Sequence, residues 1–389
     1  MKIVIFYKYF RTYGGQEKVI YNLVHYLADK GYKVDVYAFK VDAEPKNSNI
    51  TVNKVYFPVG GGLRELFFAL YSFIKGKKIK KKNKDVCILG VGKSFYSDIY
   101  RGDSGAHSYY FKRAVLKYPN KLSRLLYRLR KFLSLSHWVN LCIETLNFKI
   151  FADSKKAFIL PSNFTKKQII DKFKLDERKI VLISNGVDLD RFKPMPDFQQ
   201  KLKKEMKIDK DELVFCFVST NHKLKGLCYL LKALKNLKDK GYSFKLVVAG
   251  GNYRSYFKSI ISRNNLQDRV ICLGKRSDIE TVYSGCDVFV YPTLYDAAAL
   301  VVLEAMACGL VPVVSKYNGT SEVVINGENG FIINEPSDVH EIEETLEFVL
   351  ENRNKLPKLR ENVLNSIKRY PSSNVFSKIE EIIKRNCGA

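Results

Sequence analysis

Long apolar runs are absent from this chain of 389 residues, although 46% of the residues are hydrophobic. No run approaches the roughly 18–20 residues that a membrane helix needs, so we expect no integral insertion into a membrane. The amino terminus, MKIVIFYKYF, is too short and too polar for a signal peptide. At roughly 100–200 residues per domain, the length predicts two or three domains with cores of their own.

Paired cysteine motifs are absent as well. The eight cysteines are scattered, none forms a C-x-x-C pair, and several lie in apolar, strand-like runs. A zinc ribbon or a redox motif is therefore not expected. We expect the cysteines to act as small apolar side chains in a reducing compartment.

Acidic residues are scarce in the first half. Residues 1–185 hold 36 Lys and Arg against 14 Asp and Glu, whereas residues 186–389 hold 30 against 26. One half therefore carries most of the net charge of +26. A strongly basic half is suited to binding nucleic acid, an anionic membrane or an acidic substrate. Because the charge lies in one half and no nucleic-acid motif accompanies it, we expect no nucleic-acid partner.

Strand and helix patterns alternate along both halves. In the first half, strands are expected at 2–6, 33–39, 85–90, 157–161 and 180–184, with a helix at 14–30. In the second half, strands are expected at 213–219, 244–250, 270–274, 288–291, 311–315 and 330–333, with helices at 227–240, 255–265, 278–286 and 300–308. This alternation predicts an α/β protein with parallel sheets covered on both faces. A proline-containing, charged break over 186–210 marks the domain boundary.

Two loops of the first half contain candidate ligand-binding residues. Gly14 and Gly15 follow a strand and open a helix, where free amides attract phosphate and glycine lets a ligand approach. A tight turn without a ligand is the simpler interpretation. Asp103 and His107 lie in a glycine-rich loop beyond the strand 85–90, where an Asp and a His can orient or deprotonate a hydroxyl. Turn chemistry with a surface histidine explains them equally well.

The second half contains a sharper pattern, Asp296-Ala-Ala-Ala-Leu-Val-Val-Leu-Glu304. A helix is expected to begin near Ala298, which places Asp296 at or beside its cap and Glu304 two turns in. An acid in so apolar a helix needs a partner, which vicinal hydroxyls of a ligand would supply. The alternative is a plain N-cap and a partly buried helix residue.

Two lysines, Lys223 and Lys225, follow a strand at the same sheet edge. Two lysines at this position can neutralise a diphosphate. Taken alone, they also fit an ordinary solvated turn, because lysine is usually exposed.

The stretch 287–331 resembles the signature of family 4 retaining glycosyltransferases of the GT-B fold. Its parts are Leu303–Val314 (LEAMACGLVPVV), Gly319–Glu322 (GTSE) and Asn329–Phe331 (NGF), with Asp296 and Glu304 as the two acids of an E-x7-E element. The segment Tyr7–Gly15 is similar to glucosyltransferases of the lipopolysaccharide core that act on heptose. The resemblance covers most of the chain and is weakest over 41–84 and 115–150. Two departures are an Asp as the first acid and Ser219 where the family often has an Arg.

This resemblance implies two Rossmann-like domains that face each other across a cleft. Residues 1–188 would form the acceptor domain and residues 189–372 the nucleotide-sugar domain, with the C-terminal helix of 373–389 crossing back to the first domain. The implied enzyme is a hexosyltransferase that acts with retention on a glycan or lipid-linked acceptor in lipopolysaccharide or cell-surface polysaccharide synthesis. A sugar-nucleotide epimerase of the same fold and a basic nucleic-acid-binding protein are the alternatives.

The resemblance also implies roles for the donor residues. Glu304 would bind the ribose of a UDP- or GDP-hexose, and Lys223 and Lys225 would stabilise the leaving diphosphate, the task of metal ions elsewhere. No D-x-D motif is evident near this site, so no metal and no cofactor is expected. The residues expected to hold the hexose are Asp296 and, through their amides, Ala298, Ala299 and Leu300.

The candidates of the first half receive implied roles in the same way. Gly14 and Gly15 would let the first domain approach the diphosphate. Asp103 or His107 would lie near the acceptor or the sugar 6-hydroxyl.

Basic residues interleave with leucines over 112–139, which end near the sole tryptophan, Trp138. A second basic segment, Lys75–Lys84, holds seven lysines in ten residues. Basic residues around an apolar helical stripe predict binding to an anionic membrane surface. We therefore expect a cytoplasmic protein, peripheral on the inner face of the cytoplasmic membrane. The alternative is that the leucines are ordinary core residues and the lysines a solvated face.

Overall fold

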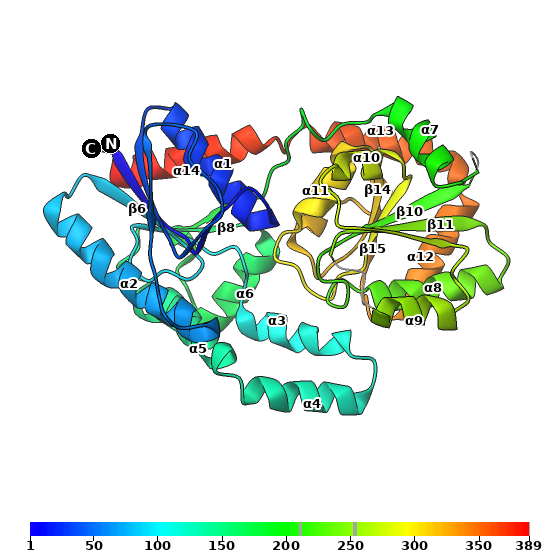
Figure 1. Ribbon diagram of the computed structural model, residues 1–389, viewed down its shortest axis with the longest axis horizontal. Helices are drawn as coiled ribbons and strands as arrows, with labels where there is room; N and C mark the ends of the chain where they lie inside the picture. The colour runs from blue at the N-terminus through cyan, green and yellow to red at the C-terminus, as the bar shows by residue number, and fades with distance from the viewer. Residues whose placement is uncertain (210–211, 252–254, 389) are drawn as a thin grey trace. The chain divides into compact units, whose positions relative to one another are not determined.

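The computed structural model describes residues 1–209, 212–251 and 255–388, and the chain divides into two compact units (Figure 1). Unit 1 comprises residues 1–112, 120–184 and 373–389, and unit 2 comprises residues 113–119 and 185–372. Lys210, at the end of the expected break, and Ala389 lie outside the described residues. Each unit carries its own parallel sheet and its own helices, which confirms the predicted α/β class.

The sheet of unit 1 has seven parallel strands in the order β5-β3-β1-β6-β7-β8-β9. Their bounds are β1 Lys2–Phe6, β3 Lys33–Ala38, β5 Ile50–Lys54, β6 Val86–Val91, β7 Ile99–Arg101, β8 Ala157–Leu160 and β9 Ile180–Leu182. Two short strands, β2 Tyr9–Phe10 and β4 Lys40–Val41, pair separately. The strand order reverses between β1 and β6, whose carboxyl ends therefore open a crevice.

The helices of unit 1 connect these strands. Their bounds are α1 Gly15–Asp29, α2 Gly61–Lys82, α3 His107–Ala114, which runs into the segment assigned to unit 2, α4 Lys121–Phe132, α5 Leu135–Thr145, α6 Asn163–Phe173 and α14 Ser372–Cys387. Helix α1 buries Ile20, Leu23, Val24 and Leu27, the face that the 3.6-residue period predicts.

Helix α14 returns to unit 1, as the fold prediction required. Val375, Phe376, Ile379 and Ile383 join the core that contains β1, β3 and β6. At the polar edge of this contact, the hydroxyls of Tyr26 and Tyr32 each donate to Glu380, both at 3.0 Å. The last helix of the chain is therefore an integral part of the first unit.

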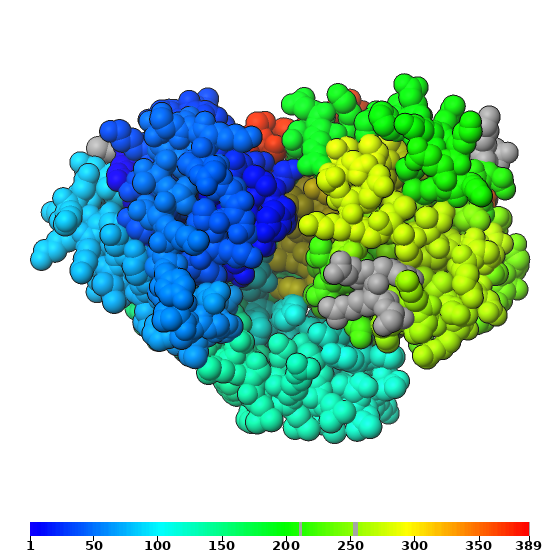
Figure 2. All heavy atoms as spheres, viewed as in Figure 1, coloured from blue at the N-terminus to red at the C-terminus, as the bar shows by residue number. Residues whose placement is uncertain are grey.

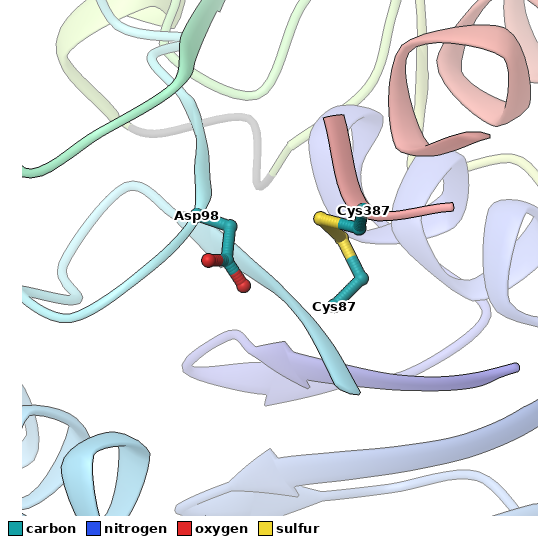
Figure 3. Close-up of side chains that lie close together, drawn as sticks. All are labelled: Cys87, Asp98 and Cys387. Atoms are coloured by element: carbon teal, nitrogen blue, oxygen red, sulfur yellow. A yellow bond between two sulfur atoms is a disulfide. The ribbon is translucent and has the colours of Figure 1, made fainter. Parts of the chain in front are cut away.

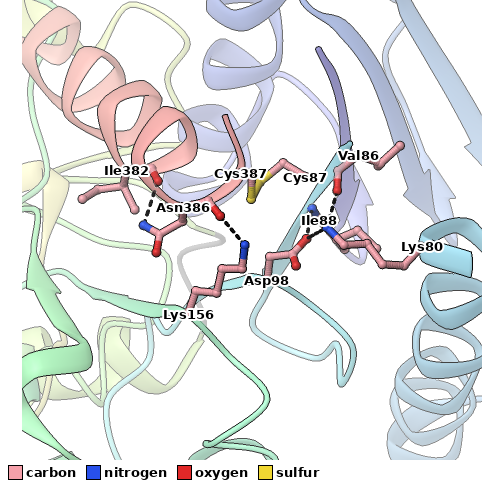
Figure 4. Close-up of a disulfide and its surroundings, with 9 residues drawn as sticks. All are labelled: Lys80, Val86, Cys87, Ile88, Asp98, Lys156, Ile382, Asn386 and Cys387. Atoms are coloured by element: carbon pink, nitrogen blue, oxygen red, sulfur yellow. Dashed lines mark hydrogen bonds and ion pairs between the residues drawn. A yellow bond between two sulfur atoms is a disulfide. The ribbon is translucent and has the colours of Figure 1, made fainter. Parts of the chain in front are cut away.

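A disulfide joins Cys87 of β6 to Cys387 at the end of α14, with the two Cα atoms 5.4 Å apart (Figure 3). Figure 4 shows its surroundings, where Lys156 donates to the carbonyl of Asn386 in the same helix. The expectation that the cysteines act only as small apolar side chains is wrong for this pair. It holds for Cys216 and Cys286, which are free and buried.

Helix α4 lies at the surface of its unit (Figures 1 and 2), and its apolar side chains are exposed. Within it, Tyr127 alone is buried among the residues that the structure describes. The exposed apolar side chains recur every three or four residues: Leu122 67%, Leu125 52%, Leu126 57%, Leu129 52% and Phe132 64%. The interpretation of these leucines as ordinary core is therefore wrong.

The sheet of unit 2 has six parallel strands in the order β12-β11-β10-β13-β14-β15. Their bounds are β10 Leu213–Val218, β11 Phe244–Ala249, β12 Val270–Gly274, β13 Val288–Tyr291, β14 Val311–Ser315 and β15 Phe331–Ile333. Every predicted strand is present, with ends that agree within one residue. The helices are α7 Pro196–Glu205, α8 Leu227–Asp239, α9 Ser255–Arg263, α10 Ile279–Ser284, α11 Leu300–Ala307, α12 Val339–Glu351 and α13 Leu356–Ile367.

Candidate active site

The strand order of unit 2 reverses between β10 and β13, which pair side by side. Open α/β sheets bind ligands at the carboxyl ends of strands at such a reversal. Strand β10 leads into the loop that carries Lys223 and Lys225, and β13 leads to Asp296. The fold therefore brings together residues that lie some 70 positions apart in the chain.

Lys225 and Asp296 form an ion pair, and their side chains are 15% and 19% exposed. The lysine amine also donates to the carbonyl of Tyr295 at 3.2 Å, and the Tyr291 hydroxyl donates to the same carboxylate oxygen of Asp296 at 3.1 Å. Burial raises the pKa of Tyr291 well above its ordinary value, and the charge on Asp296 adds to this shift. Tyr291 therefore remains a hydrogen-bond donor to the carboxylate.

The turn that carries Lys225 depends on a glycine. Gly226 has a φ of +82° and caps α8. A Cβ at this position would collide with the carbonyl of Pro292, which lies directly after β13. Any other residue would push the lysine loop away from the strand that leads to Asp296.

Asp296 is not the N-cap of α11, because that position belongs to Ala299. The other carboxylate oxygen of Asp296 accepts from the Ala298 amide at 3.3 Å, in a turn that precedes the helix. Asn318, from the loop after β14, accepts from the Ala299 amide at 3.2 Å instead. The interpretation of Asp296 as a plain N-cap is therefore wrong.

The first turn of α11 leaves amides without partners. The N–H groups of Leu300 and Val301 have no acceptor in the part of the chain that the structure describes. Both residues are half-buried. Such orphan donors at a helix start, together with the helix dipole, favour negative charge.

Glu304 lies in the second turn of α11 and is half-buried. The Tyr283 hydroxyl donates to it at 3.4 Å. Burial raises the pKa of Tyr283 well above its ordinary value, and Glu304 contributes to the same shift. The acid in the apolar helix thus has a protein partner, and its contact with a ribose stays a prediction.

Lys223 lies apart from the Lys225–Asp296 pair. Its amine is 3.9 Å from the ring centroid of Tyr256, and among residues 1–209, 212–251 and 255–388 no carboxylate lies within ion-pair distance of it. It lines an open recess of about 530 Å³ whose other walls are Lys117, Tyr118, Thr220, Asn221, His222 and Phe257. The two lysines therefore offer one paired and one unpaired cation on the same loop.

Gly14 and Gly15 open α1 as predicted. Gly14 is the N-cap with a φ of +92°, and Gly15 is the first helical residue. Glu17 of the same turn pairs with Arg11 at 2.7 Å and lies against Gly14. The turn geometry requires glycine at position 14, and the contact of this turn with a diphosphate stays a prediction.

Asp103 and His107 follow β7, a strand that the sequence did not predict, rather than β6 directly. Asp103 accepts from Arg101 at 2.7 Å and from Gln16, so both of its oxygens hold protein groups. His107 opens α3 and faces a cavity, with its Nε2 3.0 Å from Nδ1 of His137. Burial, helped by His137, lowers the pKa of His107 to about 4. Its ring is therefore neutral near pH 7.

The sequence patterns did not point to several residues that help to form these sites. Tyr291 and Asn318 fix Asp296 and the start of α11, and Tyr283 contacts Glu304. Tyr291 ends a predicted strand at the ligand-binding edge, so its position was a usable signal. Nothing in the sequence around Asn318 or Tyr283 marks them.

One side-chain cluster has the composition of a metal site. Cys87, Asp98 and Cys387 place possible ligand atoms within 4.8 Å of one another (Figure 3). Both sulfurs are in the disulfide, and Asp98 pairs with Lys80 at 3.0 Å (Figure 4). In this state the cluster offers no thiolate. The absence of a metal requirement stays a prediction.

Comparison with known proteins identifies the class. Residues 13–191 match the family described as Glycosyltransferase Family 4, and residues 198–366 match Glycosyl transferases group 1. The chain belongs to the glycosyltransferases of the GT-B fold, with a family 4 domain followed by a group 1 domain. In the described residues, no helix combines the length and apolarity needed to cross a membrane.

Curated relatives match parts of the chain. It is 31% identical to the UDP-Gal:alpha-D-GlcNAc-diphosphoundecaprenol alpha-1,3-galactosyltransferase of Escherichia coli over 44% of this chain and 45% of that protein. It is 27% identical to the capsular polysaccharide biosynthesis glycosyltransferase CapM of Staphylococcus aureus over 54% and 53%. The chain thus spans about half the length of these relatives.

Solved structures match the whole chain. WaaG, a glycosyltransferase involved in lipopolysaccharide biosynthesis, superposes with a TM-score of 0.81 at 17% identity, over 98% of this chain and 99% of that one. Anabaena HepE in complex with UDP and glucose gives a TM-score of 0.69 at 19% identity, over 99% of both chains. At this identity the likeness establishes the fold.

Proposed function

We propose that the protein transfers a hexose from a nucleotide-sugar donor, with retention, to a glycan or lipid-linked acceptor in the synthesis of lipopolysaccharide or another cell-surface polysaccharide. The observation that carries this proposal is the Lys225–Asp296 pair beside the open first turn of α11, at the strand reversal of unit 2. This unit is the part of the chain that matches the group 1 family.

In this proposal, different residues of the donor site bind different parts of the nucleotide sugar. Lys223 and Lys225 face the diphosphate, whose negative charge grows as the glycosidic bond breaks, and positioned cations stabilise that charge in the transition state. Asp296 is held by Lys225 and Tyr291, so its carboxylate is oriented before a hexose hydroxyl arrives. The free amides at the start of α11 add a site for negative charge or for sugar hydroxyls.

The names of relatives support the substrate class. The Escherichia coli relative uses UDP-Gal and a diphosphoundecaprenol-linked acceptor, and HepE has been solved with UDP-glucose. A UDP- or GDP-hexose therefore comes first among donors to be tested. A glycan or lipid-linked molecule is the corresponding acceptor.

The test is a panel of UDP- and GDP-hexoses, assayed for hydrolysis without acceptor and for transfer to glycan acceptors. We expect one donor to be turned over without added metal, and NMR of the product to show the donor's anomeric configuration. Lys225→Ala should lower turnover, while Lys232→Ala, an exposed lysine on α8, serves as the matched control. Conversion of a sugar nucleotide into its epimer would favour the epimerase, and no turnover of any donor would refute the proposal.

We further propose that the protein binds an anionic membrane surface through α4. The side chains of Leu122, Leu125, Leu126, Leu129 and Phe132 form an exposed stripe, flanked by Lys121, Arg124, Arg128, Arg130 and Lys131. An apolar stripe bordered by basic residues is the composition of helices that lie in a membrane interface. Trp138, 48% exposed, adds an aromatic side chain suited to the same depth.

This surface would place the enzyme on the inner face of the cytoplasmic membrane, beside a lipid-linked acceptor. Each basic residue near an anionic surface contributes about 1 kcal/mol to such binding. Sedimentation with anionic vesicles tests the proposal, and retention of the protein in the supernatant at low salt would contradict it.

A further inference from the structure

The strand reversal of unit 1 holds a cavity of about 250 Å³. Tyr7 and Lys8 reach it from the end of β1, and Gly92 and Lys93 from the end of β6. Pockets for drug-sized ligands measure about 300–1,000 Å³, so this cavity suits one sugar ring better than an extended chain.

Within the described residues, most charged side chains around this cavity form close ion pairs. Lys8 pairs with Glu65 at 3.3 Å, and Glu144 pairs with Lys172 at 2.6 Å. Asp103, behind the wall, pairs with Arg101 at 2.7 Å. The lining histidine, His107, is neutral near pH 7 for the reason given above.

Lys93 is the exception. Its amine donates to the side-chain oxygen of Asn140, and no carboxylate within the described ranges lies within 4.0 Å of it. Burial lowers the pKa of Lys93, and the more distant charges of Glu65 and Glu144 offset this shift only in part. A partly buried charge without a directly paired carboxylate is costly, and an anion supplied by a ligand would lower that cost.

A second polar group in the same wall is unsatisfied. The hydroxyl of Tyr7, a residue that is 1% exposed, has no hydrogen-bond partner among the residues described. Buried hydroxyls usually have a hydrogen-bond partner, and a bound water, ion or ligand group is one explanation for an exception. The cavity thus combines an unbalanced cation with an unused hydroxyl.

We propose that this cavity binds an anionic group on a sugar of the acceptor, a phosphate monoester or a carboxylate, with Lys93 as its counter-ion. The inference deepens the proposed function and rests on it, because that function assigns the acceptor to unit 1. Lys93 would select acidic acceptor sugars over neutral ones. Asn140 would orient the amine toward the anion.

Calorimetric titration of the full-length protein tests this with glucose, glucose 6-phosphate and glucuronate as probes. We expect at least one acidic sugar to bind roughly 10- to 100-fold more tightly than glucose, the range of one charge-assisted contact. The preferred acid distinguishes a phosphate from a carboxylate. Lys93→Gln should abolish the preference, and Lys93→Arg should retain most of it. Lys78→Gln removes the same charge from an exposed position of α2 and should leave the preference intact.

Three results would overturn the inference. They are equal binding of all three sugars, an undiminished preference in a folded Lys93→Gln variant, and displacement of the acidic sugar by UDP. NMR gives an independent readout, because the pKa of the Lys93 amine should rise when the acidic sugar binds. UDP and GDP binding, measured in parallel, reports on unit 2. If a nucleotide binds and no acidic sugar does, the inference fails and the donor assignment stands.

Discussion

Removing two leucines from the exposed stripe of α4 should release the protein from anionic membranes. Leu126 and Leu129 are 57% and 52% exposed and lie on the same face. Full burial of a leucine is worth about 1.5–3 kcal/mol, so burial of the exposed half contributes about 1 kcal/mol for each residue. The double change Leu126→Gln/Leu129→Gln should therefore cost about 2 kcal/mol of membrane binding, or roughly 30-fold in the partition constant.

The same change should leave the fold nearly untouched. Both side chains already face solvent, and exposed substitutions usually alter the free energy of unfolding by less than about 0.5 kcal/mol. Phe348→Gln on α12, 45% exposed in unit 2, is the matched control and should bind vesicles like the wild type. Urea unfolding of all three proteins verifies that only membrane binding differs.

The assay is sedimentation with vesicles of phosphatidylglycerol and phosphatidylcholine at low salt. Binding by the wild type should fall as salt is added, because the basic residues beside the stripe act through screened charge. If the double variant binds the vesicles as strongly as the wild type does, the apolar stripe is not the membrane contact. Binding that depends on salt but not on the leucines would leave only the basic residues, including Lys75–Lys84, as the cause.

Three further outcomes are expected. Glu304→Gln should weaken binding of the donor nucleotide by about 1–2 kcal/mol, because a ribose hydrogen bond loses its charge assistance; calorimetry with UDP and GDP measures this. Lys225→Ala should lower kcat more than it raises KM, because its charge acts mainly as the leaving group departs; steady-state kinetics on the hydrolysed donor separates the two constants. The free energy of unfolding should decline as the pH falls from about 6.5 to 4. His107 alone should account for at most about 3 kcal/mol of this decline, because its ring binds a proton in the unfolded chain but stays neutral in the native protein, where its pKa is about 4. His107→Gln should flatten that part of the pH profile in urea denaturation.

Each of these predictions can be contradicted independently of the others. Unchanged kinetics in both Glu304→Gln and Lys225→Ala would sink the donor assignment, whatever the membrane result. An identical pH profile in His107→Gln would mean that the ring titrates as it does in the unfolded chain.

The sheet of unit 2 was predictable because its strands are short apolar runs bounded by polar or glycine-containing turns. The burial of β10, β13 and β14 along their whole lengths is the reason for that clear pattern. In unit 1, β5 alternates weakly and contains Asn53 and Lys54, and β7 has only three residues. Such strands are recognised by their neighbours in the sheet, which a local pattern does not contain.

The proximity of the donor residues was predictable, because the carboxyl ends of parallel strands lie at the same edge of a sheet. Lys225 and Asp296 follow neighbouring strands, so their meeting follows from topology. Their detailed partners do not, because Asn318 reaches α11 from a loop after another strand. The pairing of Cys87 with Cys387 was equally inaccessible, since 300 positions separate two unremarkable cysteines.

The Cys87–Cys387 disulfide has a mechanical consequence. The bond closes a covalent ring that contains all of residues 185–372, so a force applied to the two ends of the chain passes from Cys87 to Cys387 without loading unit 2. Stretched between its ends, the oxidised protein should extend by only the residues outside the ring, roughly 300 Å at about 3.5 Å for each residue. With a reductant the same pull should release the whole chain, roughly 1,400 Å. The thiol state at the carboxyl end therefore decides whether the donor-binding unit is mechanically shielded.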